Sequence, residues 1–346
     1  MIDLKDKRIA IIGGAGFIGH HLALELKQRG AEVEVIDSLQ VNNLLYFSSK
    51  LADIHNRDLY LKIIHERLSL MSEAGIPVHV QDARDYHQLC QLMDRIKPQV
   101  VIHLAAVAHA GRANKDPYST FDHSLRTLEN ALDSSRQHVE QFIYFSSSMV
   151  YGNFKTAEVS EDHPLEPIGI YGALKLSGEK IVIAYNQVYG MNYTIIRPSA
   201  LYGPRCVSRR VGQIFIENAL AGTKLRVEGD GNEKLDFTNI EDLVEGICLT
   251  IQNPKSRNQI FNMTCGNSRS IRELLSTIQD HFPEAEVEYI ERDKLMPFRG
   301  TLSVDKAKEL IGYSPKVTLE EGMMKYIEWY RGLMASSEEK VVGAHI

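Results

Sequence analysis

Cysteine is scarce in this sequence and follows no pairing pattern. The 346 residues include four cysteines, and no two of them form a Cys-x-x-Cys pair. The four are Cys90, Cys206, Cys248 and Cys265. Because structural zinc sites and disulfide frameworks need closely spaced cysteines, we expect neither a metal site nor a disulfide-stabilised fold. Isolated thiols are typical of a reducing compartment, so a cytoplasmic location is predicted.

The sequence also lacks an excess of positive charge and any long apolar run. Lys and Arg number 39 against 45 Asp and Glu, which gives a net charge of −6. Nucleic-acid-binding proteins usually carry a basic surface, so nucleic acid is not expected as a partner. The first apolar run, Arg8–Ile12, ends in two glycines, which argues against a signal peptide or membrane span there. The other apolar stretches are strand-sized, so no membrane partner is expected.

What the sequence does contain is an alternation of short apolar runs and helical segments. An apolar run of this length that ends in turn residues is typical of a buried parallel strand. The predicted strands are Arg8–Ile12, Glu32–Ile36, Val78–Gln81, Val100–Ala105, Gln141–Phe145 and Tyr193–Arg197. Strand–helix–strand units at this spacing predict an α/β fold with a doubly wound parallel sheet of the Rossmann type.

The domain organisation is predicted from the point where this alternation stops. Residues 1–197 are expected to form the sheet domain, to which the chain returns within residues 235–265, near Phe237–Asn239. Residues 198–335 are expected to form mainly a smaller C-terminal α/β substrate lobe, and residues 336–346 a mobile tail. In the long connection after the second strand, Asp58–Ala74 predicts an extra helix. It could be a lid, an oligomer contact or, most commonly for an apolar stripe, a packing element.

A glycine-rich turn follows the first predicted strand and opens a helix. Its glycines permit a tight turn, a close approach of a pyrophosphate and close packing of helix on strand, while the helix N-terminus attracts phosphate. The residues expected to bind a dinucleotide here are Gly13, Gly16, Phe17, Ile18 and Gly19. Asp37 ends the next strand, where a carboxylate can accept both ribose hydroxyls and repel a 2′-phosphate. The pattern therefore predicts NAD, rather than NADP, as cofactor.

A second pattern concerns acid–base chemistry. Tyr171 and Lys175 are four residues apart, which places them on one face of a helix. An ammonium group beside a phenol favours the phenolate, so we expect Lys175 to lower the pKa of Tyr171 and Tyr171 to remove a proton from a substrate hydroxyl. Ser147 and Ser148 follow the fifth strand, at the edge of the sheet where α/β folds bind ligands. A serine hydroxyl there can contact both the tyrosine and the substrate.

Together these motifs resemble the extended short-chain dehydrogenases/reductases, and within them the nucleotide-sugar epimerase/dehydratase family. The resemblance extends from residue 8 to about residue 325, in the family's order. The matching stretches are residues 13–19, 82–85, 103–106, 146–152, 171–175, 197–198, 201–205, 229–231, 236–237 and 242–243. This set is specific for the family and much less so for the substrate.

The resemblance implies roles for further residues. It implies Tyr171 as base, Lys175 as the residue that tunes it and Ser147 as the hydroxyl member of the catalytic set. It also places Asp82 and Ala83 beside the adenine, Leu104, Ala105 and Ala106 beside the nicotinamide-side phosphates and ribose, and Ser199 beside the nicotinamide. The family resemblance further implies a homodimer built on two helices per subunit.

Two departures from the family pattern concern the substrate. Dehydratases of the family carry an acidic pair where this chain has Ser148 and Met149, so the residues for water elimination are missing. A phosphate-binding arginine is common in the family where this chain has Leu235. Contact with the substrate's phosphates is therefore expected from Arg299, assisted by Arg205, Arg209 and Arg210, although Arg209 and Arg210 are equally compatible with a solvated charge pair.

A further loop could contact the sugar. His109 and Arg112 follow the segment assigned to the nicotinamide, and an arginine there could pair with a substrate carboxylate. Single His or Arg residues in loops are more often structural.

The sequence therefore predicts an NAD-dependent isomerase that epimerises a nucleotide-sugar substrate, at C4, through a transient 4-keto intermediate. Three alternatives stay open. A net NAD-dependent dehydrogenase or 4-ketoreductase would use the same residues, and a C3/C5 epimerase would need a further acid–base group, for which Cys206 is a candidate. A non-catalytic NAD-binding module would not need the intact Ser–Tyr–Lys set.

Overall fold

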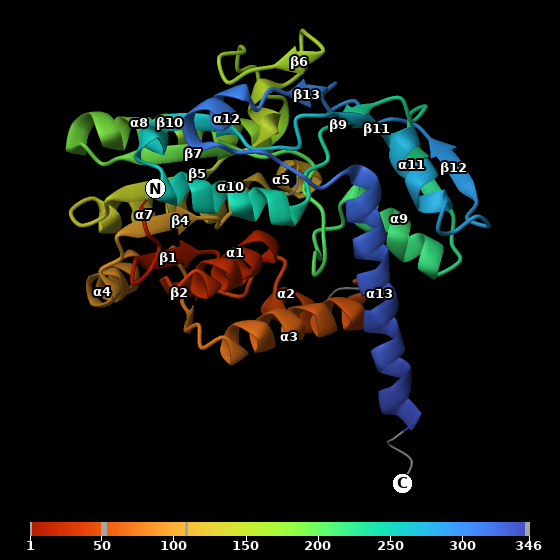
Figure 1. Ribbon diagram of the computed structural model, residues 1–346, viewed down its shortest axis with the longest axis horizontal. Helices are drawn as coiled ribbons and strands as arrows, with labels where there is room; N and C mark the ends of the chain where they lie inside the picture. The colour runs from red at the N-terminus through yellow and green to blue at the C-terminus, as the bar shows by residue number, and fades with distance from the viewer. Residues whose placement is uncertain (1, 50–53, 108–109, 343–346) are drawn as a thin grey trace.

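The computed structural model describes residues 2–49, 54–107 and 110–342. Its centre is a parallel sheet with strands in the order β10-β7-β5-β4-β1-β2-β3 (Figure 1). These strands are β1 (Arg8–Ile12), β2 (Glu32–Asp37), β3 (Val78–Val80), β4 (Val100–His103), β5 (Gln141–Phe145), β7 (Tyr193–Arg197) and β10 (Gln259–Asn262). The crossover from β3 back to β4, beside β1, makes the sheet doubly wound, as predicted.

Helices cover both faces of the sheet and also form part of the smaller lobe beside it. They are α1 (Phe17–Gln28), α2 (Leu44–Ser48), α3 (Arg57–Glu73), α4 (Tyr86–Ile96), α5 (Ala110–Lys115), α6 (Pro117–Phe121), α7 (Thr127–Ser135), α8 (Gly169–Tyr189), α9 (Val211–Leu220), α10 (Ile240–Gln252), α11 (Ile271–Gln279), α12 (Asp305–Ile311) and α13 (Leu319–Val342). Within the described chain, no helix combines the length and apolar composition that crossing a bilayer requires.

The two faces follow from the two-residue period of the strands. Ile9 and Ile11 of β1 belong to an apolar core shared with α1 and α10. Ala10 and Ile12, which alternate with them, belong to a second core shared with α4, α7 and α8. Both cores are apolar, which explains why the strands read as continuous hydrophobic runs rather than alternating ones.

Beyond Pro198 the chain forms a smaller group of elements at one side of the sheet, where Figure 1 shows α9, α11 and β12 together. Its short strands pair as β8 (Leu225–Glu228) with β12 (Val287–Ile290), and β9 (Lys234–Leu235) with β11 (Arg269–Ser270). A further pair, β6 (Glu158–Val159) with β13 (Thr301–Leu302), joins segments from the two halves of the sequence. Helix α13 packs with α11.

Two of the predicted elements differ from the structure in detail. The chain returns to the sheet through β10, which lies inside the predicted range 235–265 but not at Phe237–Asn239, where a β-bridge joins Asn239 to Tyr202 before α10 begins. Asn239 instead caps α10 by accepting a hydrogen bond from the backbone N–H of Glu241. The tail expected from residue 336 begins as helix, because α13 continues to Val342. The extra helix predicted at Asp58–Ala74 is α3.

Candidate active site

The glycine-rich turn lies at the carboxyl end of β1. Gly13 has a φ of +81°, and a Cβ atom built on it would lie 2.6 Å from the backbone nitrogen of Ala105. A Cβ on Gly19 would lie 2.5 Å from Gly14. These two positions therefore exclude any larger residue, and they bring α1 and the segment after β4 close to the turn. Gly16 precedes the first turn of α1, whose free N–H groups face the cavity beside it.

Asp37 is held rigidly at the end of β2. Its Oδ1 accepts a hydrogen bond from the backbone N–H of Leu39 at 2.7 Å, and its Oδ2 accepts one from Ala15 at 3.0 Å. Burial raises the pKa of this carboxyl, while the two backbone donors and the nearby Arg67 act in the opposite direction. The carboxylate is thus fixed beside the glycine turn without a direct ion pair to an arginine.

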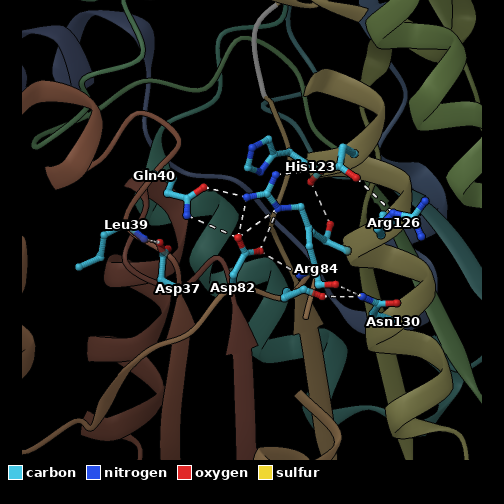
Figure 2. A network of polar contacts seen from close by, with 11 residues as sticks. Asp37, Leu39, Gln40, Asp82, Arg84, His123, Arg126 and Asn130 are labelled. Carbon is cyan, nitrogen blue, oxygen red and sulfur yellow. Dashed lines mark hydrogen bonds and ion pairs between the residues drawn. The ribbon is translucent and has the colours of Figure 1, made fainter. Parts of the chain in front are cut away.

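Polar side chains close the far end of this region, between the loops after β2 and β3 (Figure 2). Arg84 donates from Nε to Asp82 at 3.0 Å and from Nη2 to the side-chain oxygen of Gln40 at 2.9 Å. A third contact, from Nη1 to Asp122, measures 2.8 Å. Burial raises the pKa of Asp82, but the contacts with Arg84 outweigh it and leave the pKa below its usual value.

One elongated cavity joins these features. Most of the residues predicted to bind the cofactor line it: Gly13, Gly16, Phe17, Ile18, Gly19, Asp37, Asp82, Ala83, Leu104, Ala105 and Ala106. Ser199 lies deeper, after β7, where its hydroxyl is buried and has no hydrogen-bond partner among the described residues. A cavity with an anion-attracting helix end and a fixed carboxylate fits a dinucleotide such as NAD.

Tyr171, Ser147 and Lys175 come together near the carboxyl ends of β5 and β7. The hydroxyl of Ser147 is in hydrogen-bonding contact with Tyr171, and Lys175 Nζ lies 6.0 Å from the centre of the tyrosine ring. Lys175 donates to the backbone carbonyl of Phe145 at 2.6 Å. Burial lowers the pKa of Lys175 to about 8, against the opposing effect of Glu179.

The predicted effect of Lys175 on the pKa of Tyr171 stays a prediction, because Lys175 is not among the groups that shift this pKa here. Burial raises the pKa of Tyr171, and the groups that oppose this effect are Arg210 and Ser147, not Lys175. The reason is geometric, since the ammonium group points to the carbonyl of Phe145 rather than to the phenol oxygen. The cation that acts on Tyr171 comes from beyond β7.

A buried ion pair holds α8, and with it Tyr171 and Lys175, against the sheet. Arg197 donates from Nη2 to Glu179 at 2.7 Å and from Nε at 2.9 Å, and both side chains are almost fully buried. Arg197 also donates to the hydroxyl of Tyr151, and Ser146 donates to Glu179. Because every partner is satisfied, this network fixes the register of α8 on the sheet.

A second cavity, a cleft of about 640 Å³, lies between the sheet and the smaller lobe. Ser147 and Met149 form its inner wall, and Leu235 is part of its lining. Several cationic side chains also line it: Arg209, Arg210, Arg226, Lys234, Arg292 and Arg299. The Nε atoms of Arg210 and Arg299 are buried without a partner among the described residues, so these guanidinium groups have unused donors in the cleft wall.

Three of the predicted substrate-binding residues do not line this cleft. Arg205 turns away from it and donates to His20 at 3.0 Å and Glu66 at 3.1 Å. Arg112 donates to Asn42 at 2.7 Å and lies 4.6 Å from the centre of the Tyr46 ring. Ser148 is buried, and its backbone N–H donates to Pro198. His109 falls outside the described residues.

Sequence reasoning missed two groups that line the cavities. Arg67 of α3 reaches the cofactor cavity, and its signal was a charged residue within the apolar stripe of the predicted helix. Arg292, paired with Glu233, and Phe298 line the substrate cleft. Arg292 lies 4.0 Å from the centre of the Phe298 ring, and no local motif marks either residue.

Comparisons with known proteins agree with this geometry. A model of the NAD dependent epimerase/dehydratase family matches residues 9–264. UDP-glucuronate 4-epimerase 1 of Arabidopsis thaliana is 30% identical over 93% of this chain and 76% of its own length. The crystal structure of the Thermotoga maritima UDP-glucose 4-epimerase with UDP-glucose is 27% identical, covers 94% of this chain and 99% of its own, and has a TM-score of 0.81.

A second solved structure contains the cofactor. The Thermus thermophilus UDP-glucose 4-epimerase, in complex with NAD, is 27% identical, covers 94% of this chain and 99% of its own, and has a TM-score of 0.79. The family match covers well over half of the chain, and the glycine turn and Asp37, which line one cavity, suit the same dinucleotide. The chain is therefore a member of the NAD-dependent epimerase/dehydratase family, with NAD as its cofactor.

Proposed function

We propose that this protein is an epimerase that inverts C4 of a nucleotide-activated sugar. The observation that carries the proposal is that the cofactor cavity and the substrate cleft share wall residues. Leu201, Ser208 and Arg210 line both, next to Ser147 and Tyr171. A sugar in the cleft would therefore present one carbon to both the nicotinamide end of the cofactor cavity and the phenol. Similar proteins are 4-epimerases of UDP-glucose and UDP-glucuronate.

The side chains around the two cavities suggest a separate role for each in the reaction. When bound, NAD supplies a reversible hydride acceptor for the reacting carbon. Tyr171 accepts the proton of the C4 hydroxyl and later returns it, and Ser147 hydrogen-bonds both the phenol and the sugar oxygen. Lys175, held by its hydrogen bond to the carbonyl of Phe145, would contact the ribose side of the cofactor. Rotation of the 4-keto sugar in the cleft then presents its other face.

The cations of the outer cleft suit a nucleoside diphosphate. Arg299 and Arg210 each have a buried, unused Nε donor, and guanidinium groups bind phosphates with paired hydrogen bonds. In this proposal Arg299 replaces the arginine that is absent at Leu235. Phe298 lines the same cleft and is 60% exposed, so part of its side chain could stack on the base.

The alternatives are less well supported by the same cavities. An eliminating dehydratase needs acids where this chain has Ser148 and Met149, and Met149 lines the cleft as an apolar residue. A C3/C5 epimerase would need Cys206 beside the sugar, but Cys206 is buried outside the lining of either cavity, and burial raises its pKa. A net dehydrogenase would use the same residues and differs in its cofactor balance.

The lobe division at residue 198, a cytoplasmic location and a homodimer also stay predictions. Exposed apolar side chains on α6 and α8 support the homodimer, because the two helices contact each other and such side chains are typical of a subunit interface.

The test is product analysis on a panel of nucleotide hexoses and uronates. Purified protein, with no NAD added, should invert C4 of at least one UDP-sugar by NMR, without accumulation of NADH at 340 nm. Stoichiometric NADH would favour the dehydrogenase. Loss of water from a hexose, seen by mass spectrometry, would contradict the use made of Ser148 and Met149.

A further inference from the structure

Helix α3 carries a cation on its buried side. The buried residues of this helix are Tyr60, Ile63, Ile64, Arg67 and Met71, and their spacing of three and four residues defines the stripe that faces the protein. Arg67 is fully buried within this stripe. Fully buried arginines are rare unless their donors are paired, so its surroundings indicate what it binds.

Two of the three nitrogens of Arg67 are paired with one backbone oxygen. Nε donates to the carbonyl of Arg205 at 2.9 Å, and Nη2 donates to the same atom. The third nitrogen, Nη1, is buried and has no partner among the described residues. Arg67 lines the cofactor cavity. The protein therefore fixes one side of the guanidinium and leaves the Nη1 donor of this lining residue unpaired.

The neighbouring groups do not neutralise this charge by direct contact. Asp37 lies near, but each of its carboxylate oxygens is already taken by a backbone N–H, from Ala15 and Leu39. Burial lowers the pKa of His20, and it lowers the pKa of His21 to about 3, so both rings are neutral at pH 7. The pKa of Arg67 is also lowered by burial, to about 10, and Arg67 stays charged.

The position of this cation relative to the glycine turn identifies the part of the cofactor it can reach. His20 links the two, because its Nδ1 contacts the carbonyl of Gly16 at 2.9 Å and its Nε2 accepts from Arg205. Arg67 thus lies near the first turn of α1, whose N–H groups attract phosphate, and both line the same cavity. The anionic part of a dinucleotide at that turn is its diphosphate.

We propose that Arg67 is a cofactor-binding residue that donates through Nη1 to the diphosphate of NAD. The first βα turn binds the diphosphate from one side, and Arg67, delivered by the extra helix between β2 and β3, binds it from the other. Because α3 is also held at Tyr60 by Glu217, the contact joins the cofactor to the packing of the smaller lobe. The expected consequence is slow release of NAD. The inference concerns NAD binding and holds whichever reaction the site catalyses.

The test compares nucleotide fragments on the full-length protein after removal of bound nucleotide. By calorimetry, Arg67→Met should weaken ADP and NAD by roughly 10- to 100-fold, the effect of one charge-assisted hydrogen bond. Adenosine, which lacks the diphosphate, should change less than about 3-fold on the same scale. In the holoprotein, NAD release should accelerate by a similar factor. Arg67→Lys keeps the charge but not the forked arrangement of donors, so its ADP and NAD affinities should lie between those of Arg67→Met and the unmodified protein.

Arg57→Met is the matched control. Arg57 begins the same helix, and its guanidinium donates to the carbonyls of Phe47 and Ser48 outside the cofactor cavity. The Arg57→Met substitution should leave the ADP affinity within about 3-fold of that of the unmodified protein. Equal losses of adenosine and ADP in the Arg67 variants would assign the residue to the ribose or to packing and overturn the proposal, as would unchanged ADP affinity. If Arg67→Met does not fold, the Arg67→Lys comparison decides the same question.

Discussion

At the scale of single residues, the acid–base chemistry depends on how Tyr171 is buried. Burial alone keeps the phenol protonated, since it raises the pKa. The neighbours that counter it are a hydroxyl, Ser147, and a guanidinium, Arg210. Lys175 contributes its anchoring bond to Phe145 instead. The groups that lower the pKa of Tyr171 thus lie on the substrate side of the site.

The first prediction removes the titrating oxygen. Tyr171→Phe keeps the ring and its packing, so fold and NAD content should not change. The turnover number kcat should fall on the order of 10²–10⁴-fold, the usual contribution of a positioned acid–base group. Tyr289→Phe, on the exposed strand β12, is the control. Near-full turnover of Tyr171→Phe with an identified substrate would rule out the proposed mechanism.

The second prediction concerns pH. The reaction needs the phenolate, so kcat should rise with pH through the pKa of Tyr171. Arg210 lowers that pKa, and Arg210→Met should therefore raise it and move the acidic limb of the kcat–pH profile to higher pH. Arg209→Met, which lines the same cleft, should change KM without moving the limb. An unshifted profile for Arg210→Met would show that this cation does not act on Tyr171.

The same scale shows which site residues a sequence can predict. The glycine turn and the Tyr171–Lys175 pair are contiguous motifs, and their side-chain directions follow from local backbone geometry, so the structure brings each set together. Arg205 and Arg67 differ, because their directions depend on how α3 packs against a loop 138 residues further along the chain. Sequence reasoning singled out Arg205, whose side chain contacts His20 and Glu66, and did not single out Arg67, which lines the cofactor cavity.

At the scale of elements, helix α3 is joined by hydrogen bonds to elements of the smaller lobe as well as packed by apolar side chains. Its N-terminal half is joined to α9 and α13 through Glu217, which accepts hydrogen bonds from Tyr60 at 2.8 Å and Tyr330 at 2.7 Å. Asn56 and Gln213 donate to the same carboxylate. The helix was predictable from its 3.6-residue period, because local spacing determines that. Its partners were not, since they are separated from it by more than 150 residues.

The third prediction tests this junction. Glu217→Gln replaces one acceptor oxygen with an NH₂ group that must face a donor, which should destabilise the protein by about 1–3 kcal/mol. Urea unfolding measures this as a lower midpoint with an unchanged slope. Glu286→Gln, at a largely exposed side chain, is the control and should have little effect. If the two variants unfold alike, Glu217 does not stabilise the contact between α3, α9 and α13.

At the scale of the whole molecule, the order of the strands explains where the two cavities meet. Both open at the carboxyl ends of parallel strands, and the order reverses between β1 and β4, the position at which doubly wound folds bind ligands. Sequence predicted six of these strands, five of them from mostly buried apolar runs, while β3 (Val78–Val80) is only partly buried. For the seventh it gave only the range 235–265, which contains β10, because β10 is four residues long and its polar ends, Gln259 and Asn262, hide the pattern.

The last prediction concerns the surface through which two subunits would form a dimer. Tyr118 of α6 is 84% exposed and Val188 of α8 is 70% exposed, and large apolar side chains on neighbouring helices are typical of a subunit interface. If two copies pair through this face, Tyr118→Glu combined with Val188→Glu should bury charge and shift the protein toward monomer in sedimentation experiments. Tyr289→Glu, 53% exposed on β12 of the smaller lobe, should leave the dimer intact. Monomeric unmodified protein at micromolar concentration would contradict the homodimer, and an unchanged dimer in the double variant would place the interface elsewhere.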